Sequence, residues 1–252
     1  MLRSVYHASF RTLLPLRGAW SDWRGRSVLD SEALPPARLR FRVGETLSIP
    51  SFLIVGERCA MLLDEVGLRE TGRVLDFGCG CGRTLRWLMK RSPCLELHGV
   101  DVDAEAIEWC REHFPQGKFL VNNPDPPLPF PHEFFDAIYC LSVFTHLAEA
   151  MQDRWILELR RILKPGGLLI LTVHGAAAAA QLKPEIGVEL ARSGFVHKRS
   201  RKLKGILPDW YHTTLHTPEY IEQRLSARGF EQVQYTVVAD GIQDAVTARK
   251  ST

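Results

Sequence analysis

The feature that most constrains the fold is a regular alternation of short apolar runs and amphipathic stretches over residues 73–173. The apolar runs have the length of strands and are predicted at Arg73–Phe77, Leu95–Asp101, Lys118–Asn122, Phe135–Cys140 and Gly167–Val173. The amphipathic stretches repeat apolar residues at helical spacing and are predicted as helices at Arg83–Lys90, Ala104–His113 and Glu149–Leu163. Strands that alternate with helices predict an α/β fold, in which a parallel sheet is covered by helices on both faces.

The flanking segments extend this pattern. A helix is predicted over Phe52–Val66, and a later helix over Pro218–Arg228 precedes two strands at Val233–Val238 and Ala245–Ala248. The Asp240-Gly241 dipeptide between these strands is typical of a tight turn, so they are expected to pair antiparallel.

Two segments fall outside the strand–helix rhythm. Residues 1–50 form a predicted N-terminal arm before the domain at 51–252, and the first 26 residues hold five arginines and one acid. Such a start is typical of a transit peptide or of a poorly ordered surface arm, and we favour the arm. Residues 175–217 form an insertion with a basic run and several histidines, which predicts a lid over a substrate.

Composition narrows the class of protein. The 252 residues are 45% hydrophobic and 24% charged, as in ordinary globular proteins, and the net charge of +3 is too mild to argue for nucleic acid, so a small-molecule partner is expected. No apolar run approaches the ~20 residues of a membrane span. The six cysteines are scattered through apolar segments rather than framing loops. They are expected to be reduced thiols, and the protein is expected to be cytoplasmic.

A glycine-rich turn follows the first predicted strand. Gly78, Gly80 and Gly82 allow backbone to approach a ligand closely, and the helix after them begins with free N–H groups. A dinucleotide fingerprint that began at Gly78 would need glycine at position 83, where the chain has Arg83. Asp101 ends the next strand, where a carboxylate can accept hydrogen bonds from both hydroxyls of a ribose.

Four motifs in order carry a family resemblance. They are D-x-G-x-G-x-G at 76–82, G-V-D at 99–101, F-D-A-I-Y-C-L-S-V-F-T-H-L at 135–147 and L-K-P-G-G at 163–167. Over roughly residues 50–250, the chain resembles the class I S-adenosylmethionine-dependent methyltransferases. The resemblance implies a Rossmann-like, seven-stranded, mostly parallel sheet whose last strand is antiparallel, with S-adenosylmethionine as cofactor.

The resemblance also implies roles for single residues. Gly78, Gly80 and Gly82 would form the turn beneath the cofactor. Asp76 would orient its methionine end, Asp101 would bind the ribose, and Val102 would lie against the adenine. Leu141 and Ser142 would lie near the sulfonium. Where the family often has a Gly-Asp pair after the third strand, this chain has Asn122 and Asn123, either of which can contact the adenine.

Histidines mark the expected acceptor side. His146 follows the fourth strand and is a candidate general base, with a core or capping histidine as the alternative. The candidate substrate-binding residues are His174, Tyr211, His212 and His216. The spacing of His212 and His216 would suit metal binding on a helix, but the threonines between them and Pro218 after them weaken that helix, and we predict no metal.

The predicted function is methyl transfer from S-adenosylmethionine to an oxygen or nitrogen of a small molecule. One alternative is an RNA- or protein-directed methyltransferase that uses the basic run 197–204, although no aromatic residue interleaves the cationic part of that run. Another is a cofactor-binding subunit without turnover. A nicotinamide-dependent oxidoreductase is disfavoured by Arg83 and by the later motifs.

Overall fold

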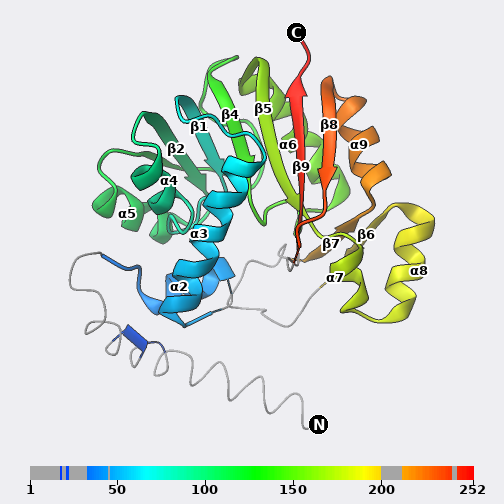
Figure 1. The fold of residues 1–252 in the computed structure, drawn as a ribbon, viewed down its shortest axis with the longest axis horizontal. Helices are drawn as coiled ribbons and strands as arrows, with labels where there is room; N and C mark the ends of the chain where they lie inside the picture. The colour runs from blue at the N-terminus through cyan, green and yellow to red at the C-terminus, as the bar shows by residue number, and fades with distance from the viewer. Residues whose placement is uncertain (1–17, 19–20, 23–32, 45, 200–211, 240–242) are drawn as a thin grey trace.

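A computed structural model describes residues 18, 21–22, 33–44, 46–199, 212–239 and 243–252 (Figure 1). Its centre is a seven-stranded sheet in the order β3-β2-β1-β4-β5-β9-β8. The strands are β1 (Gly72–Phe77), β2 (Leu95–Asp101), β3 (Lys118–Val121), β4 (Phe135–Cys140), β5 (Leu163–Val173), β8 (Phe230–Thr236) and β9 (Asp244–Lys250).

The pairing of these strands confirms the predicted fold. The pairs β1·β2, β1·β4, β2·β3 and β4·β5 are parallel, whereas β9 runs antiparallel to both β5 and β8. The chain is therefore an α/β protein with a Rossmann-like, mostly parallel sheet and an antiparallel last strand. The predicted turn at Asp240-Gly241 lies outside the described residues.

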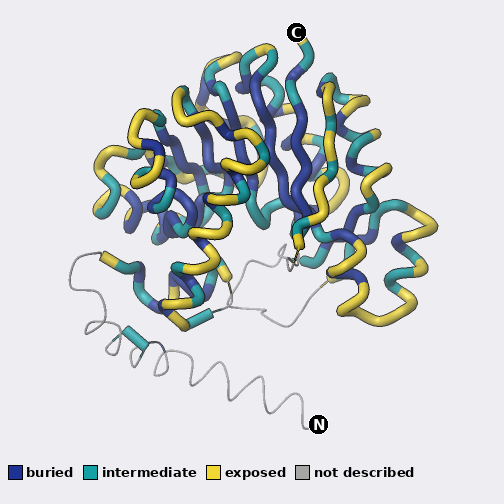
Figure 2. Tube along the Cα trace, in the orientation of Figure 1, coloured by how far each residue is buried: buried dark blue, intermediate teal, exposed yellow. Residues whose placement is uncertain are grey.

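Helices cover both faces of the sheet because successive residues of each strand point to opposite sides. The described helices are α2 (Ala37–Gly44), α3 (Ile49–Glu65), α4 (Leu85–Arg91), α5 (Ala104–His113), α6 (Glu149–Ile162), α7 (Ala176–Ala180), α8 (Pro184–Ser193) and α9 (Pro218–Ser226). Val74 of β1 packs in one buried cluster with α3, α4 and α5, while the next residue, Leu75, packs in the other with α6 and α9. The tube in Figure 2 shows the central strands β1, β4, β5 and β9, between these layers, as mostly buried.

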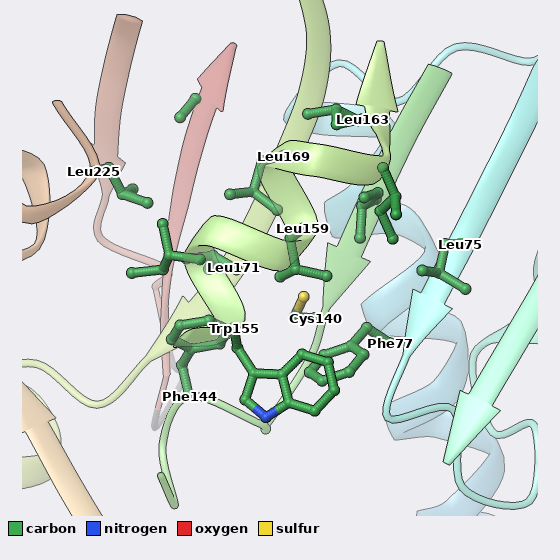
Figure 3. Packing of buried hydrophobic residues seen from close by; sticks show 14 of the residues in the cluster. Leu75, Phe77, Cys140, Phe144, Trp155, Leu159, Leu163, Leu169, Leu171 and Leu225 are labelled. Atoms are coloured by element: carbon green, nitrogen blue, oxygen red, sulfur yellow. The ribbon is translucent and has the colours of Figure 1, made fainter. Parts of the chain in front are cut away.

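Trp155 packs α6 against the sheet, in the buried cluster that also contains Leu75. It extends from α6 over the end of β1, where its ring lies 4.5 Å from that of Phe77 between centroids (Figure 3). Leu159, one helical turn later, reaches the same cluster as Cys140 of β4. The apolar face that the sequence predicts for 149–163 is thus the face that binds α6 to the sheet.

Some element boundaries differ from the prediction. The helix expected from Arg83 begins at Leu85 because residues 80–84 form turns, as the glycines with positive φ require. The strand expected at Val233–Val238 starts earlier, at Phe230. β8 is an edge strand with a bulge between Glu231 and Gln234, so most of its side chains are exposed, and its polar residues masked the strand pattern.

The insertion at 175–217 holds α7, α8 and a two-stranded sheet of β6 (Phe195–Lys198) and β7 (Thr213–His216). The segment with His216 is thus a strand, not a helix. β7 joins the main domain through an isolated bridge between His174 and Leu215. Tyr211 and most of the basic run lie outside the described residues.

In the described part of the chain, no single helix is long and apolar enough to cross a bilayer. Within the same residues, α2 and α3 taken together reach that length and apolar character, but the pair is bent by 47°. All six cysteines are unpaired, and four of them are buried.

Candidate active site

A cavity of about 1320 Å³ lies beyond the carboxyl ends of β1, β2 and β4. This is the edge at which open parallel sheets bind ligands, next to the point where the strand order reverses between β1 and β4. The loops after the three strands line it. They contribute Gly78 and Gly80 after β1, Val102 and Asp103 after β2, and Leu141 and Ser142 after β4.

The glycine turn approaches its neighbours too closely for any other residue. Gly78 and Gly80 have φ of +85° and +51°, and an added Cβ would lie 2.4 Å from Val143 and 2.3 Å from Val43, respectively. Gly82 does not line the cavity. A Cβ there would lie 2.5 Å from Phe114, so this glycine instead allows the turn to pack against the end of α5.

Asp101 ties the glycine turn to the end of β2. Its Oδ2 accepts a hydrogen bond from the Gly80 N–H at 2.7 Å, and its Oδ1 accepts one from the Asp103 N–H at 2.8 Å. The carboxylate still lines the cavity, and each of its oxygens has a second lone pair for a ligand hydroxyl. The residues therefore fit the ribose of an adenosine.

Of the two asparagines after β3, only Asn122 lines the cavity, while Asn123 is exposed. The Asn122 N–H donates to the Asp101 carbonyl at 3.0 Å, and its Nδ2 donates to the Asn123 carbonyl at 2.7 Å. The side-chain oxygen of Asn122 could accept a hydrogen bond from an adenine amine bound there. Val102 lines the same end.

Asp76 is a buried acid in the cavity wall, with 3% of its surface exposed. Burial raises its pKa from 3.8 to about 8, and the charge of Asp101 acts in the same direction. Tyr139 and Arg83 counteract part of this effect. A cation bound beside Asp76 would stabilise the ionised carboxylate, as the ammonium group of a methionine moiety would.

Imidazoles line the end of the cavity at which the family resemblance implies the methyl acceptor. His146 Nδ1 is 2.6 Å from the His212 carbonyl oxygen, which can only accept, so Nδ1 carries the hydrogen. Burial lowers the pKa of His146 to about 4, so the ring is neutral near pH 7 and its basic lone pair lies on Nε2. His197 also lines this end, and its Nδ1 is 2.8 Å from the Thr214 hydroxyl. The hairpin of β6 and β7 thus brings His197 and His212 to the cavity.

The other two described histidines of the predicted acceptor set lie elsewhere. The ring of His174 lies beside that of His146, with the two centroids 6.3 Å apart. His174 does not line the cavity, and its Nδ1 is 3.2 Å from the Thr214 carbonyl oxygen. His216 is fully buried, and its Nε2 is 3.0 Å from Gln152 Oε1. The expectation that His216 contacts substrate is corrected: β7 directs it into the core against α6. Tyr211 lies outside the described residues.

Ser142 lines the cavity after β4 and has a positive φ of +60°. Its N–H donates to the Thr172 hydroxyl at 2.8 Å, and its hydroxyl is 2.8 Å from Gln243 Nε2. Leu141, just before it, also lines the cavity. These contacts hold the loop after β4 in one place relative to β5.

Several lining residues were not predicted from the sequence. They are Arg42 and Val43 of α2, Met151 and Trp155 of α6, and His197 and Arg199 of the insertion. The helical apolar face of 149–163 is visible in the sequence, but no local pattern indicates that its first turns reach the cavity. Nothing in the sequence indicates that α2 reaches the cavity. Among the described residues, no group of three or more His, Cys, Asp or Glu side chains is placed to hold a metal ion.

Comparison with known proteins agrees with this geometry. The family described as "Methyltransferase domain" matches residues 75–171. The uncharacterized methyltransferase YdaC of Bacillus subtilis is 27% identical over 119 residues, which cover 47% of this chain and 65% of that protein. The malonyl-[acyl-carrier protein] O-methyltransferase of Methylococcus capsulatus is 28% identical over 174 residues, covering 67% and 56%. The tRNA N(3)-cytidine methyltransferase METTL2 of Mus musculus is 26% identical over 180 residues, covering 68% and 44%.

The chain thus spans roughly half the length of these curated relatives, between 44% and 65%. A crystal structure of a methyltransferase from Methanosarcina mazei has a TM-score of 0.56 at 22% identity, and the match covers 75% of this chain and 97% of that one. This likeness concerns the fold. The family match, the order of the four motifs and the sheet together show that the chain contains a class I S-adenosylmethionine-dependent methyltransferase domain.

Proposed function

We propose that this methyltransferase methylates an oxygen or nitrogen of a small molecule. The observation that carries the proposal is the continuity of one cavity from the glycine turn to the imidazoles of His146, His197 and His212. Its volume of about 1320 Å³ exceeds the ~300–1,000 Å³ of a pocket for one drug-sized ligand, so a cofactor and a small acceptor fit side by side.

When bound, the cofactor supplies an activated methyl group on a sulfonium. The protein must hold the acceptor atom in line with it and exclude water. Asp101 and Asn122 would hold the adenosine, and Asp76 would hold the ammonium of the methionine end. Leu141 and Ser142, between the two ends, would lie nearest the reacting centre.

His146 is the proposed general base for a hydroxyl acceptor. Its tautomer is fixed by the hydrogen bond to the His212 carbonyl, and its ring is neutral near pH 7. The fixed tautomer and the neutral ring leave Nε2 able to accept a proton, while the lowered pKa makes the ring a weaker base than a free imidazole. The insertion at 175–217 is proposed as the acceptor lid, since it supplies His197 and His212 to this end.

The names of the relatives give different substrates, including an acyl-carrier protein and tRNA, and so do not indicate one acceptor class. Within the described part of the basic run, Lys198 is neutralised by Glu189 at 2.6 Å, whereas Arg199 lines the cavity. This arrangement favours a small acceptor over a polyanion that follows the surface.

We also infer a cytoplasmic location from the cysteines. All six are unpaired, and Cys79, Cys81, Cys110 and Cys140 are buried. Unpaired thiols are typical of reducing compartments.

The test is a labelling experiment with methyl-labelled S-adenosylmethionine. The protein would be incubated separately with a pool of hydroxylated and amine metabolites and with total tRNA, with H146A as the comparison. Label in low-mass products, lost in H146A, is the expected result. Label in tRNA would replace the proposal with an RNA-directed one. Cofactor binding without transfer to either would favour the subunit without turnover.

A further inference from the structure

We propose that Arg42 is a positioning residue that clasps α2 to α5 across the adenosine end of the cavity, and so sets how fast the cofactor and its demethylated product leave. The proposal rests on the cofactor site described above. It assigns a role to a residue of the N-terminal arm. This arm lies outside the four family motifs and outside the matched region at 75–171.

The clasp consists of one arginine and two acids. Arg42 Nη1 donates to Asp103 Oδ1 at 2.9 Å and Oδ2 at 2.7 Å, and Nη2 donates to Glu105 Oε2 at 2.5 Å. The Arg42 side chain is 30% exposed, against 23% for Asp103 and 39% for Glu105. A half-buried arginine with several charge-assisted hydrogen bonds stabilises the contact between two helices more than a solvated surface ion pair does. For such a surface pair, ~0–1 kcal/mol is typical.

The clasp closes the wall of the cavity. Arg42 and Val43 at the end of α2, and Asp103 and Glu105 at the start of α5, all line it. Val43 also abuts the glycine turn, since a Cβ on Gly80 would lie 2.3 Å from Val43 Cγ1. The end of α2 therefore touches both the turn beneath the cofactor and the helix beside the ribose acid.

The clasp is connected to the ribose acid through Asp103. The Asp103 N–H donates to Asp101 Oδ1 at 2.8 Å, and its side chain caps α5 by accepting from the Ala106 N–H at 3.3 Å. A substitution at Asp103 would therefore disturb both α5 and the site. Arg42 can be changed without removing either of these bonds.

The rest of α2 is anchored independently of Arg42. The buried Arg40 donates to the Pro35 and Leu47 carbonyls at 2.6 and 2.9 Å, and Leu39 and Phe41 are buried. Loss of the clasp is thus expected to release the end of α2 over the cavity while the helix stays attached.

The experiment measures dissociation of S-adenosylhomocysteine from the full chain by stopped-flow displacement. R42A is expected to raise the dissociation rate about 10-fold, which corresponds to the loss of one charge-assisted pair. R42K, which keeps the charge but not the planar fork, should fall between R42A and the wild type.

R38A is the matched control, because Arg38 also pairs with Glu105 but is 64% exposed and does not line the cavity. Its dissociation rate should stay within about twofold of wild type. Added salt should speed dissociation from wild type more than from R42A.

A dissociation rate of R42A within twofold of wild type, with binding retained, would overturn the clasp and leave the proposed function intact. Equal acceleration in R38A and R42A would also overturn it, because the effect would then be general surface charge. Failure of the wild type to bind S-adenosylhomocysteine would overturn the proposed function and the clasp together.

Discussion

Removal of the buried acid Asp76 should change how both stability and cofactor binding depend on pH. Burial raises the pKa of Asp76 from 3.8 to about 8, so folding favours the protonated carboxyl. The contribution of Asp76 to the free energy of unfolding is therefore greatest below pH 3.8, and it is lost as the pH rises toward about 8. D76N keeps the shape of the side chain and removes its titration.

The magnitude follows from linkage. Between the pKa of the unfolded state and that of the folded state, the free energy of unfolding falls by about 1.4 kcal/mol for each pH unit. This decrease becomes smaller near the upper pKa. Between pH 6 and 8 the ligand-free wild type should lose about 2 kcal/mol relative to D76N. For a chain of this size, that corresponds to a relative change in Tm of roughly 4–8 °C.

Cofactor binding should show the opposite trend. A ligand cation pairs with the ionised carboxylate, so binding below about pH 8 must release a proton from Asp76. If the pKa in the complex lies well below 6, the dissociation constant falls about 50-fold from pH 6 to pH 8. The ammonium is common to S-adenosylmethionine and S-adenosylhomocysteine, whereas only the former has a sulfonium. Both ligands should therefore show the effect if Asp76 faces the ammonium.

The assay is thermal unfolding and calorimetric titration of wild type and D76N at pH 6, 7 and 8. The difference between the two proteins at each pH cancels the titration of the histidines. A difference in Tm that does not change with pH, or the same pH dependence of affinity in both proteins, would refute the reasoning. A pH effect on S-adenosylmethionine alone would assign Asp76 to the sulfonium instead.

Three further predictions concern other parts of the site and core. H146A should lower turnover about 10²-fold at saturating cofactor with unchanged affinity for S-adenosylhomocysteine, and unchanged turnover would remove His146 from the mechanism. G80A should weaken binding of S-adenosylhomocysteine at least 10-fold by titration, because φ is +51° and the new Cβ would lie 2.3 Å from Val43; wild-type affinity would show that the turn adapts. Q152A should lower the free energy of unfolding in urea by about 3 kcal/mol, because the buried Gln152 amide bonds two backbone carbonyls and His216; a loss under 1 kcal/mol would contradict that account.

The sheet could be predicted because the sequence features that determine each strand lie close to that strand along the chain. The alternation of apolar runs and helical stretches, the glycine turn and Asp101 all lie within a few residues of the features they determine. The antiparallel last strand was predicted from the turn signal, although β8 itself starts at Phe230, earlier than expected. An edge strand with a bulge and exposed polar side chains carries a weak pattern.

The remaining parts of the site depend on contacts far apart in sequence. Arg42 pairs with Glu105, 63 residues away, and no local pattern indicates that pairing. The histidines of the insertion look equivalent in the sequence, yet β7 places His212 at the cavity and His216 against Gln152 in the core. Their separation follows from the docking of the hairpin on the main domain, including the bond from the Thr214 N–H to the Thr145 carbonyl at 2.8 Å.

We expect this cavity to bind the cofactor through Asp101 and the glycine turn. Calorimetric titration with S-adenosylmethionine and S-adenosylhomocysteine tests it most directly, with D101A and D101N beside the wild type. We predict that the wild type binds both ligands, that D101A loses most of the affinity and that D101N loses less. Absence of binding to folded wild-type protein, or equal affinity in D101A, would contradict the account.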